Sequence, residues 1–524
     1  MVALRIFDGV KTIGGNKILL QDGDTKLWLD FGLNMGLQSD YYEEYLKAKS
    51  CTGLYEPVLM GILPPIRDLY RQDMNCSVAD PWALPGTEDL GDVSGIIISH
   101  GHFDHIGGLH FVRNDIPIYS SLSTAMMMKG SQDSAGGSIQ GDYCYTVAVE
   151  CDEAGLLSRG HHSKCPSASR AFRCVGEQPS SSLQEFWGWT PSCDTQRGRK
   201  HNGNTVEVTD NCGGLNIKRF PVDHSVYGAC AWAVETSEGW VVYSGDLRAH
   251  GHYADSTWKF AEEAAKLKPR ALIIEGTRIT GDPGGTERSI ASLALDEVKN
   301  ADALVVADFG LRHVERLVSF LKVAEATGRK LVILPKDAYL LYAMGFAGSD
   351  QFIPKIDNGH IVIYWEYQNV TATWQKMIHE KFGHLAVRPQ DIAQNQDQFI
   401  CCFSFLDVNE LAYIRPRPGS KWIYSSNEAF SEDLKIDFDR LGNWVEKFGM
   451  DFPGDPRVDE PGKPPKSPYH VSGHACKDDL LKLIRTIAPK ELIPVHSTSP
   501  EDYVELLQGV CKVTLPERGV TIPL

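Results

Sequence analysis

The sequence of 524 residues lacks several features that mark special classes of protein. No apolar run is long enough to cross a bilayer, so we expect no membrane partner. The first residues carry no basic flank followed by a long apolar core. We therefore expect no signal peptide and a cytoplasmic location. No internal repeat is present, which argues against a solenoid or a propeller.

The chain also lacks an excess of basic residues and an ordered cysteine framework. Its net charge of −16 argues against bulk attraction to nucleic acid. A local positive site stays open, because bound dications can dominate the field where they sit. The thirteen cysteines are odd in number and scattered, which favours reduced thiols in a cytosolic chain.

What is present is the pattern of a soluble α/β protein. The length predicts two or three domains. Short apolar runs such as "GIIISH", "WVVYSGD" and "ELIPVHS" are typical of buried strands. Helices are predicted over 312–330, with Gly328 as a stop, and over 477–490. Residues 130–215 show little periodicity and are expected to decorate the core, and 452–468 resemble a linker.

The stretch "SHGHFDHIGG" carries the strongest chemical signal in the sequence. It crowds His100, His102, Asp104 and His105 into six residues directly after an apolar strand. Imidazole and carboxylate are the usual ligands of zinc and similar dications. Such a cluster has little structural use, so it predicts metal binding at the end of the strand.

Two metal ions need more ligands than this loop offers, and three candidates follow along the chain. His224, Asp246 and His496 each lie just beyond an apolar run. Each can therefore project into the crevice at the carboxyl ends of the strands. An aspartate can bridge two dications, and such pairs of metals act in displacement at phosphorus.

The motifs, taken in order, resemble a known family. "LWLDFGL", "SHGHFDHIGG", "VDHSVYG" and "YSGDLR" are similar to the motifs of the metallo-β-lactamase fold. "IIEGTR", "HVSGHAC" and "LIPVHST" resemble the extra motifs of the β-CASP nucleases, and ribonuclease J is the nearest in look. The resemblance implies a metallo-β-lactamase αββα sandwich with an inserted β-CASP α/β domain. It implies a first domain over 1–284, including the insertion at 130–215, a β-CASP domain over 285–465, and a return segment over 466–524.

Carried onto this chain, the resemblance implies roles for the metal ligands. His100, His102 and His224 would hold one divalent ion. Asp104, His105 and His496 would hold another, and Asp246 would bridge the two. The ions would be zinc, with manganese and magnesium as alternatives. Asp30 would support the ligand loop from behind; without the resemblance it is equally well explained as a carboxylate in a turn.

The resemblance also implies the catalytic residues, which are His474, Glu275 and the ligand Asp104. Glu275 would orient His474, which would contact the scissile phosphate or assist the leaving oxygen. Ser472 and Gly473 form a small-residue turn before a helix. Backbone N–H groups there could bind a phosphate.

These features predict a metal-dependent ribonuclease, because the family's RNA enzymes carry histidine where His496 stands. Exonuclease and endonuclease action both stay open, as do the natural RNA and the oligomeric state. The alternatives are a small-molecule or DNA hydrolase of the same fold, and a catalytically silent RNA-binding subunit. A third, structural zinc is a weaker hypothesis for one set of residues in the insertion: His161, His162, Cys165, Cys174 and Cys193.

Overall fold

The structure is a computed structural model. It describes residues 1–43, 45–76, 78–135, 141–159, 168–191, 203–281, 284–310, 312–348, 351–368, 371–426, 432–457 and 467–524.

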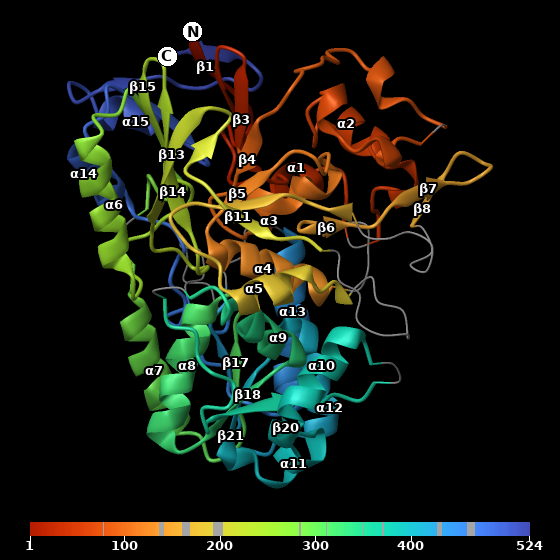
Figure 1. The fold of residues 1–524 in the computed structure, drawn as a ribbon. Helices are drawn as coiled ribbons and strands as arrows, with labels where there is room; N and C mark the ends of the chain where they lie inside the picture. Colours follow the sequence, from red (N-terminus) through yellow and green to blue (C-terminus); the bar gives the residue numbers. More distant parts are fainter. Residues whose placement is uncertain are drawn as a thin grey trace.

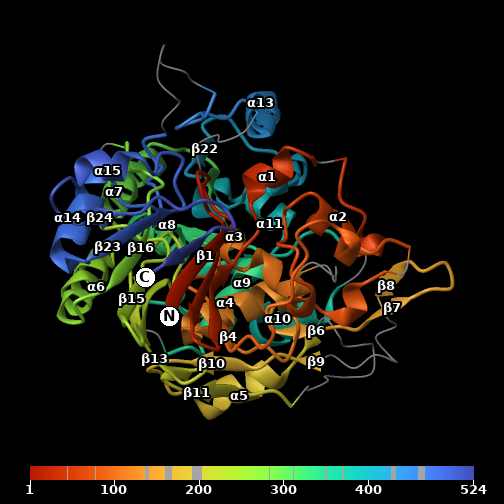
Figure 2. The same cartoon turned by 90° about the horizontal axis from the view of Figure 1, so that it is seen from above.

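Two mixed sheets form the upper half of the molecule in Figure 1. In spatial order, the first sheet comprises β11 (Val206–Val208), β10 (Phe172–Cys174), β5 (Ile118–Ser120), β4 (Gly95–Ile97), β3 (Thr25–Phe31), β2 (Lys17–Asp22), β1 (Val2–Asp8) and β25 (Thr521–Pro523). The second comprises β12 (Asn211–Cys212), β13 (Leu215–Pro221), β14 (Cys230–Thr236), β15 (Gly239–Tyr243), β16 (Ala271–Glu275), β23 (Glu491–Val495) and β24 (Lys512–Val513). The two termini lie close together beside β1, as Figure 2 shows from above.

The two sheets pack face to face and carry helices on their outer faces. Ile18 and Leu29 of the first sheet share one buried cluster with Trp232 of the second. The helices of this half are α1 (Met35–Ser39), α2 (Tyr55–Leu59), α3 (Phe103–Ile106), α4 (Leu122–Asp133), α5 (Ser181–Gly188), α6 (Ala254–Lys266), α14 (Lys477–Ile487) and α15 (Asp502–Leu506). We call these two sheets with these helices the upper lobe. The predicted αββα layering follows from apolar faces that are buried on both sides of each sheet.

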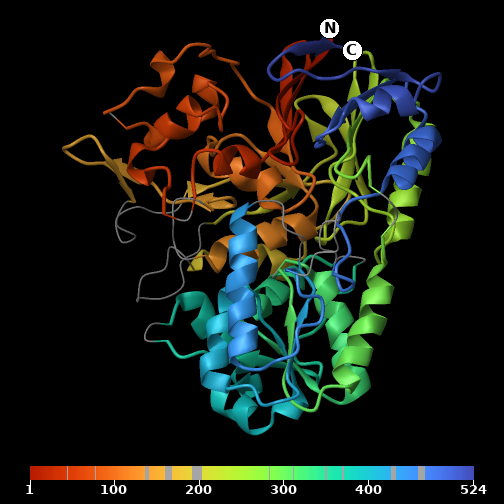
Figure 3. The ribbon, with the colours of Figure 1, turned by 180° about the vertical axis from the view of Figure 1, so that it is seen from behind.

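The third sheet is wholly parallel and lies in the lower half of Figure 1. Its order is β20 (Ala386–Val387), β19 (Ile361–Tyr364), β18 (Lys330–Ile333), β21 (Phe399–Cys402), β17 (Val305–Asp308) and β22 (Lys421–Tyr424). Its helices are α7 (Glu287–Lys299), α8 (Val314–Thr327), α9 (Pro335–Met344), α10 (Thr373–Phe382), α11 (Pro389–Gln394), α12 (Leu411–Ile414) and α13 (Glu432–Lys447), the light-blue helix of Figure 3. We call this sheet with these helices the lower lobe. Both faces are covered, as a parallel sheet requires.

The two lobes meet through buried polar contacts as well as apolar ones. Helix α4 of the upper lobe packs on α9 of the lower lobe. Tyr339 of α9 donates its hydroxyl to Asp133 of α4 at 2.7 Å, and Lys129 donates to the same carboxylate at 2.7 Å. All three side chains are buried. The Lys129–Asp133 ion pair lies within α4, and the Tyr339 hydroxyl joins it from the lower lobe. Leaving a buried polar group unpaired is costly, so this hydrogen bond favours one arrangement of the lobes.

Several sequence predictions meet the structure at this level. Helix α8 ends at Gly328, whose φ of 71° is left-handed, as predicted for a glycine stop. The stretch 130–215 was expected only to decorate the core, but β10 and β11 extend the first sheet in parallel with β5. That expectation was wrong for this part, because strands of three residues carry too little periodicity to be seen. β6 (Tyr145–Thr146) pairs antiparallel with β9 (Ala168–Ser169), and β7 (Val149–Cys151) forms a short hairpin with β8 (Leu157–Arg159).

Some predictions fall on parts of the chain that the structure does not describe. The junctions near 284 and 465 adjoin residues 282–283 and 458–466, so the exact boundaries stay predictions. Of the candidates for a structural zinc, His161, His162, Cys165 and Cys193 lie outside the described residues. Within the described residues, no helix combines the length and apolarity that a bilayer crossing needs.

Candidate metal centre

The predicted ligands gather at one edge of the upper lobe, where strands of both sheets end. His224 follows β13, Asp246 follows β15 and His496 follows β23. The pairing of the second sheet makes these strands run in the same direction, so their carboxyl ends share an edge. His100 follows β4 of the first sheet. Two sheets packed face to face thus bring distant parts of the sequence into one crevice.

Three histidines form the first ligand group. Nδ1 of His102 lies 3.0 Å from Nε2 of His100 and 3.1 Å from Nε2 of His224. Two nitrogens bound to one tetrahedral zinc lie roughly 3.3 Å apart, so this spacing suits a shared ion. Burial lowers the pKa of His102 to about 4 and lowers the pKa of His100 and of His224 well below the usual range. The rings are therefore neutral, which is the form that binds metal.

The second ligand group combines two carboxylates with two histidines. Oδ2 of Asp246 lies 3.1 Å from Nε2 of His105 and 3.5 Å from Nε2 of His496. Oδ2 of Asp104 lies 3.2 Å from the same His496 nitrogen. Asp246 also reaches toward the first group, since its Oδ2 is 3.7 Å from Nε2 of His100. One carboxylate thus stands between both groups.

The buried atoms of this site fit a bound cation. Nε2 of His105 and Oδ1 of Asp246 are buried, and neither has a hydrogen-bond partner among the described residues. Leaving such atoms unpaired is costly, and a metal ion would satisfy both. Burial opposes a positive charge on His105, but Asp246, Asp104 and Asp30 outweigh it and raise the pKa of that imidazole well above its usual value. These three carboxylates therefore stabilise a positive charge at this site, such as that of a bound cation.

In three candidate ligands, His100, His496 and His224, the ring nitrogen Nδ1 forms a hydrogen bond to a nearby oxygen. His100 donates Nδ1–H to Ser99 Oγ at 3.0 Å, and His496 donates to Thr277 Oγ1 at 2.8 Å. His224 donates to the carbonyl of Gly473 at 2.5 Å. These bonds fix the tautomer that leaves Nε2 free as a ligand atom. Sequence reasoning missed Ser99 and Thr277; the position of Ser99 directly before His100 was the one available signal.

Asp30 lies behind the second ligand group. The family resemblance implied that it would support the ligand loop from there. It accepts Nδ1–H of His105 at 2.7 Å, the Ser99 hydroxyl at 2.6 Å and the Tyr243 hydroxyl at 2.7 Å. Its φ is 58° and that of His496 is 51°, so both adopt a left-handed backbone. Such a conformation costs about 1–2 kcal/mol for residues other than glycine and persists where the surroundings hold it. The strand ends are therefore shaped for the site.

His474 and Glu275 form a pair beside the ligands. Nδ1 of His474 lies 3.0 Å from Oε2 of Glu275 and 3.9 Å from Oδ2 of Asp246. Burial disfavours the charged imidazole, but Glu275 prevails and raises the pKa of His474 to about 9. Glu275 is itself fixed, since it accepts the backbone N–H of Leu247 and of Thr277. Glu275 thus holds the protonated form of His474 in place beside the candidate ligands.

Ser472 and Gly473 form the turn before His474, and this turn lies against His474 and His224. Ser472 Oγ accepts the backbone N–H of His474 at 3.2 Å. A Cβ at Gly473 would come within 2.7 Å of Ser225 Oγ and 3.0 Å of the His224 ring. Only glycine therefore lets this turn approach His224. The predicted phosphate contacts of Ser472 and Gly473 remain a prediction.

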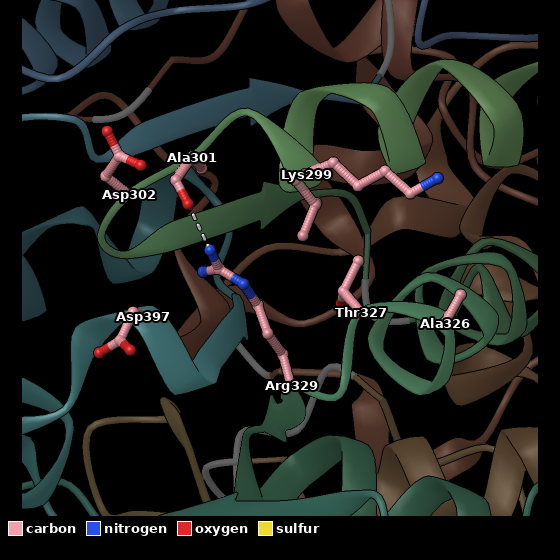
Figure 4. A pocket seen from close by; sticks show the side chains of 8 residues that line it. Lys299, Ala301, Asp302, Ala326, Thr327, Arg329 and Asp397 are labelled. Atoms are coloured by element: carbon pink, nitrogen blue, oxygen red, sulfur yellow. Dashed lines mark hydrogen bonds between the residues drawn. The ribbon is translucent and has the colours of Figure 1, made fainter.

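A separate cavity of about 470 Å³ lies in the lower lobe (Figure 4). Its lining residues Asp302, Thr327, Arg329 and Asp397 precede strands β17, β18 and β21. It therefore opens at the amino ends of the strands. Arg329 donates hydrogen bonds to the carbonyls of Ala301 and Ala303. Its guanidinium is therefore already engaged and offers no free cation to a ligand in the cavity.

Comparison with known proteins identifies the family models that match the regions holding these residues. A model of the metallo-β-lactamase superfamily matches residues 87–124, which include the first four ligands. A model described as the Zn-dependent metallo-hydrolase RNA specificity domain matches residues 467–503, which include His474 and His496. The chain has the metallo-β-lactamase fold and resembles ribonuclease J. The resemblance, the fold class and a metal-dependent hydrolase were all predicted, and the matches confirm them.

Two curated proteins named Ribonuclease J are similar to this chain over most of its length. The one from Pyrococcus abyssi is 21% identical over 417 residues, which cover 77% of this chain and 74% of that protein. The one from Corynebacterium glutamicum is 21% identical over 458 residues, which cover 84% of this chain and 51% of that protein. This chain thus spans about half of the second relative.

A solved structure shares the fold across the whole chain. The crystal structure of a protein of unknown function from Enterococcus faecalis V583 has a TM-score of 0.67 and 19% identity, with complete coverage of both chains. At this identity the likeness shows a shared fold and nothing more specific.

Proposed function

We propose that this protein is a two-metal ribonuclease that hydrolyses RNA phosphodiester bonds in RNA processing or decay. One observation carries the proposal: two ligand groups converge on Asp246, whose Oδ2 lies 3.1 Å from His105 and 3.7 Å from His100. Paired dications bridged by a carboxylate are typical of enzymes that cut phosphodiesters. We further propose the domain limits stated above and a cytoplasmic location.

In this proposal each of the candidate residues has its own role. His100, His102 and His224 hold one ion, and Asp104, His105 and His496 hold the other, with Asp246 between them. Bound zinc, or else manganese or magnesium, would supply Lewis acidity and lower the pKa of water. Asp30 orients His105 from behind.

His474 acts on the substrate in this scheme. Because Glu275 holds its Nδ1, the imidazole keeps Nε2 for the phosphate or the leaving oxygen. A positioned imidazole can donate a proton as the P–O bond breaks. Ser472 and Gly473 complete the turn that faces the phosphate. Asp104 is half-buried, so among the ligands its carboxylate is well placed to contact substrate as well.

RNA is the proposed substrate because of the names of the similar proteins and of the matched family model. Both curated relatives are named Ribonuclease J, and the matched C-terminal model is described as an RNA specificity domain. His496, which favours RNA within the family resemblance, is buried in the second group. The mode is 5′-exonucleolytic, endonucleolytic or both.

The test compares substrates on one preparation. The purified chain is loaded with zinc or manganese and given RNA labelled at either end, single-stranded DNA of the same sequence, and bis-p-nitrophenyl phosphate. We expect two metals per chain and faster cleavage of RNA than of DNA. The label that is released first distinguishes exonuclease from endonuclease action. Turnover of the small ester without RNA cleavage would favour a small-molecule hydrolase, and RNA binding without turnover would favour a silent subunit.

A further inference from the structure

Arg312 of the lower lobe reaches the ligand loop of the upper lobe. It follows β17 and precedes α8 by two positions. Its Nη1 donates to the carbonyl of Gly101 at 2.9 Å. Gly101 lies between the ligands His100 and His102. A guanidinium from the inserted part of the chain is thus held beside the proposed metal centre.

This arginine differs from the buried Arg248 and Arg316, because it forms no ion pair among the described residues. Arg248 pairs with Asp223 and Glu287, and Arg316 pairs with Glu287. Arg312 is only partly exposed, yet within the described part of the chain it forms no ion pair. The Gly101 contact is also its one hydrogen bond there. A guanidinium has five N–H donors, so most of them are left for another partner.

Stability does not explain a cation at this position. Withdrawing a charge from water without an ion-pair partner is costly, and the charge of Asp104 acts on Arg312 only through space. Burial accordingly lowers the pKa of Arg312. The position just before α8 adds to the cost, because the amino end of a helix disfavours cations. The same two features, a free guanidinium and a helix amino end, favour an anion.

We propose that Arg312 binds a non-bridging oxygen of an RNA phosphate at the metal centre, as a catalytic residue contributed by the lower lobe. The inference rests on the proposed function. A guanidinium matches the geometry of a phosphate and can contact two of its oxygens. Charge on those oxygens must be stabilised as the bond breaks, and a fixed donor in a dry cleft does this well. The contact also gives the lower lobe a direct part in the chemistry.

A purely mechanical role is the competing explanation. Arg312 could do no more than tether the loop at Gly101. A tether depends on one hydrogen bond, whereas phosphate binding depends on charge and on the spare donors. The two roles therefore respond differently to added guanidinium and to RNA binding without cleavage.

The main variant is Arg312→Ala in the full chain. With zinc or manganese at saturation, we expect kcat/KM for RNA to fall roughly 10²–10³-fold while metal content stays unchanged. Added guanidinium ion should restore part of the lost rate. Arg312→Lys keeps the charge but loses the planar pair of donors of the guanidinium. Its kcat/KM should lie between those of the wild type and Arg312→Ala.

A second measurement does not depend on turnover. Chelator-treated protein is titrated with a fluorescent oligoribonucleotide at several salt concentrations. Arg312→Ala should bind more weakly, and its slope of log affinity against log salt should be smaller by about one charge. The matched control is Arg417→Ala in the same lobe. Arg417 is half-exposed and pairs with Asp397 at 3.8 Å, so its loss should change neither measurement.

The outcomes separate the inference from the proposed function. If the wild-type chain does not cleave RNA, both fall. If the wild type cleaves RNA and Arg312→Ala cleaves and binds it equally well, only the inference falls. Loss of rate with no rescue by guanidinium and unchanged RNA binding would establish the tether instead. Should Arg312→Ala melt far below the wild type, Arg312→Gln, which can still donate to Gly101, carries the same expectations.

Discussion

His105 donates its Nδ1–H to Oδ2 of Asp30 across 2.7 Å, at the base of the second ligand group. Asp30→Asn should therefore weaken metal binding roughly 10–100-fold, because the orienting carboxylate charge is lost. Asparagine tolerates the left-handed backbone at this position, so the strand end should survive. Competition with a chelating dye measures the affinity. Asp89→Asn is the control, since Asp89 is exposed and pairs with Arg67; equal affinities for the two variants would contradict the role of Asp30.

Asp246→Ala should remove more metal than His102→Ala. Asp246 approaches both ligand groups, whereas His102 contacts only the first. We expect His102→Ala to keep most of one ion and Asp246→Ala to lose most of both. Metal per chain is measured by mass spectrometry after gel filtration, with His384→Ala, an exposed histidine, as control. One ion lost in each variant would show that Asp246 does not bridge.

The sequence was sufficient to predict that the candidate ligands converge, because the segments that carry them follow apolar strands. His100, His224 and His496 needed only the rule that such strands end at a shared edge. The supporting contacts needed the fold itself. Tyr243 and Asp30 are 213 residues apart, and Thr277 and His496 are 219 apart, so no local pattern links them.

The lower lobe was harder to predict for the same physical reason. Its strands were recognisable as apolar runs, but the cation beside the candidate metal centre was not. Arg312 meets Gly101 across 211 residues and between two lobes. Nothing near either residue in the sequence signals that contact. The sequence thus predicted that the candidate ligands of the upper lobe come together, and it left the contact from the lower lobe open.

Asp308→Asn should stabilise the protein more at alkaline pH than at acidic pH. Asp308 is buried, and burial together with the charge of Asp407 raises its pKa to about 8, despite a hydrogen bond from Trp422. The unfolded carboxyl titrates near pH 3.9, so between about pH 4 and pH 8 the folded state holds a proton that the unfolded state has lost. Stability therefore falls as pH rises through this window.

The neutral amide removes that dependence and can still accept from Trp422. We expect a gain on the order of a few kcal/mol at pH 8.5 and little gain at pH 5. Thermal unfolding in chelator, which removes the pH dependence of metal binding, measures the difference at each pH. A gain that is the same at both values would show that Asp308 is already charged in the folded protein.

His474→Ala should abolish cleavage while leaving the metal in place. The prediction meets a real alternative, because Asp246, Glu275, His474 and His496 together offer four ligand atoms within 4.8 Å of one another. Two observations favour a catalytic role. His474 precedes a helix and does not end a strand, and its Nδ1 is already held by both oxygens of Glu275.

Losing a positioned acid typically costs 10²–10⁴-fold in rate, roughly 3–5 kcal/mol of barrier. Single-turnover cleavage of labelled RNA and metal content should be measured on the same samples of His474→Ala, Asp246→Ala and the control His384→Ala. We expect His474→Ala to separate the two readouts, with the rate lost and the metal kept, and Asp246→Ala to lose both together. If His474→Ala loses metal as Asp246→Ala does, then His474 is a ligand, and the proton for the leaving oxygen must come from another group.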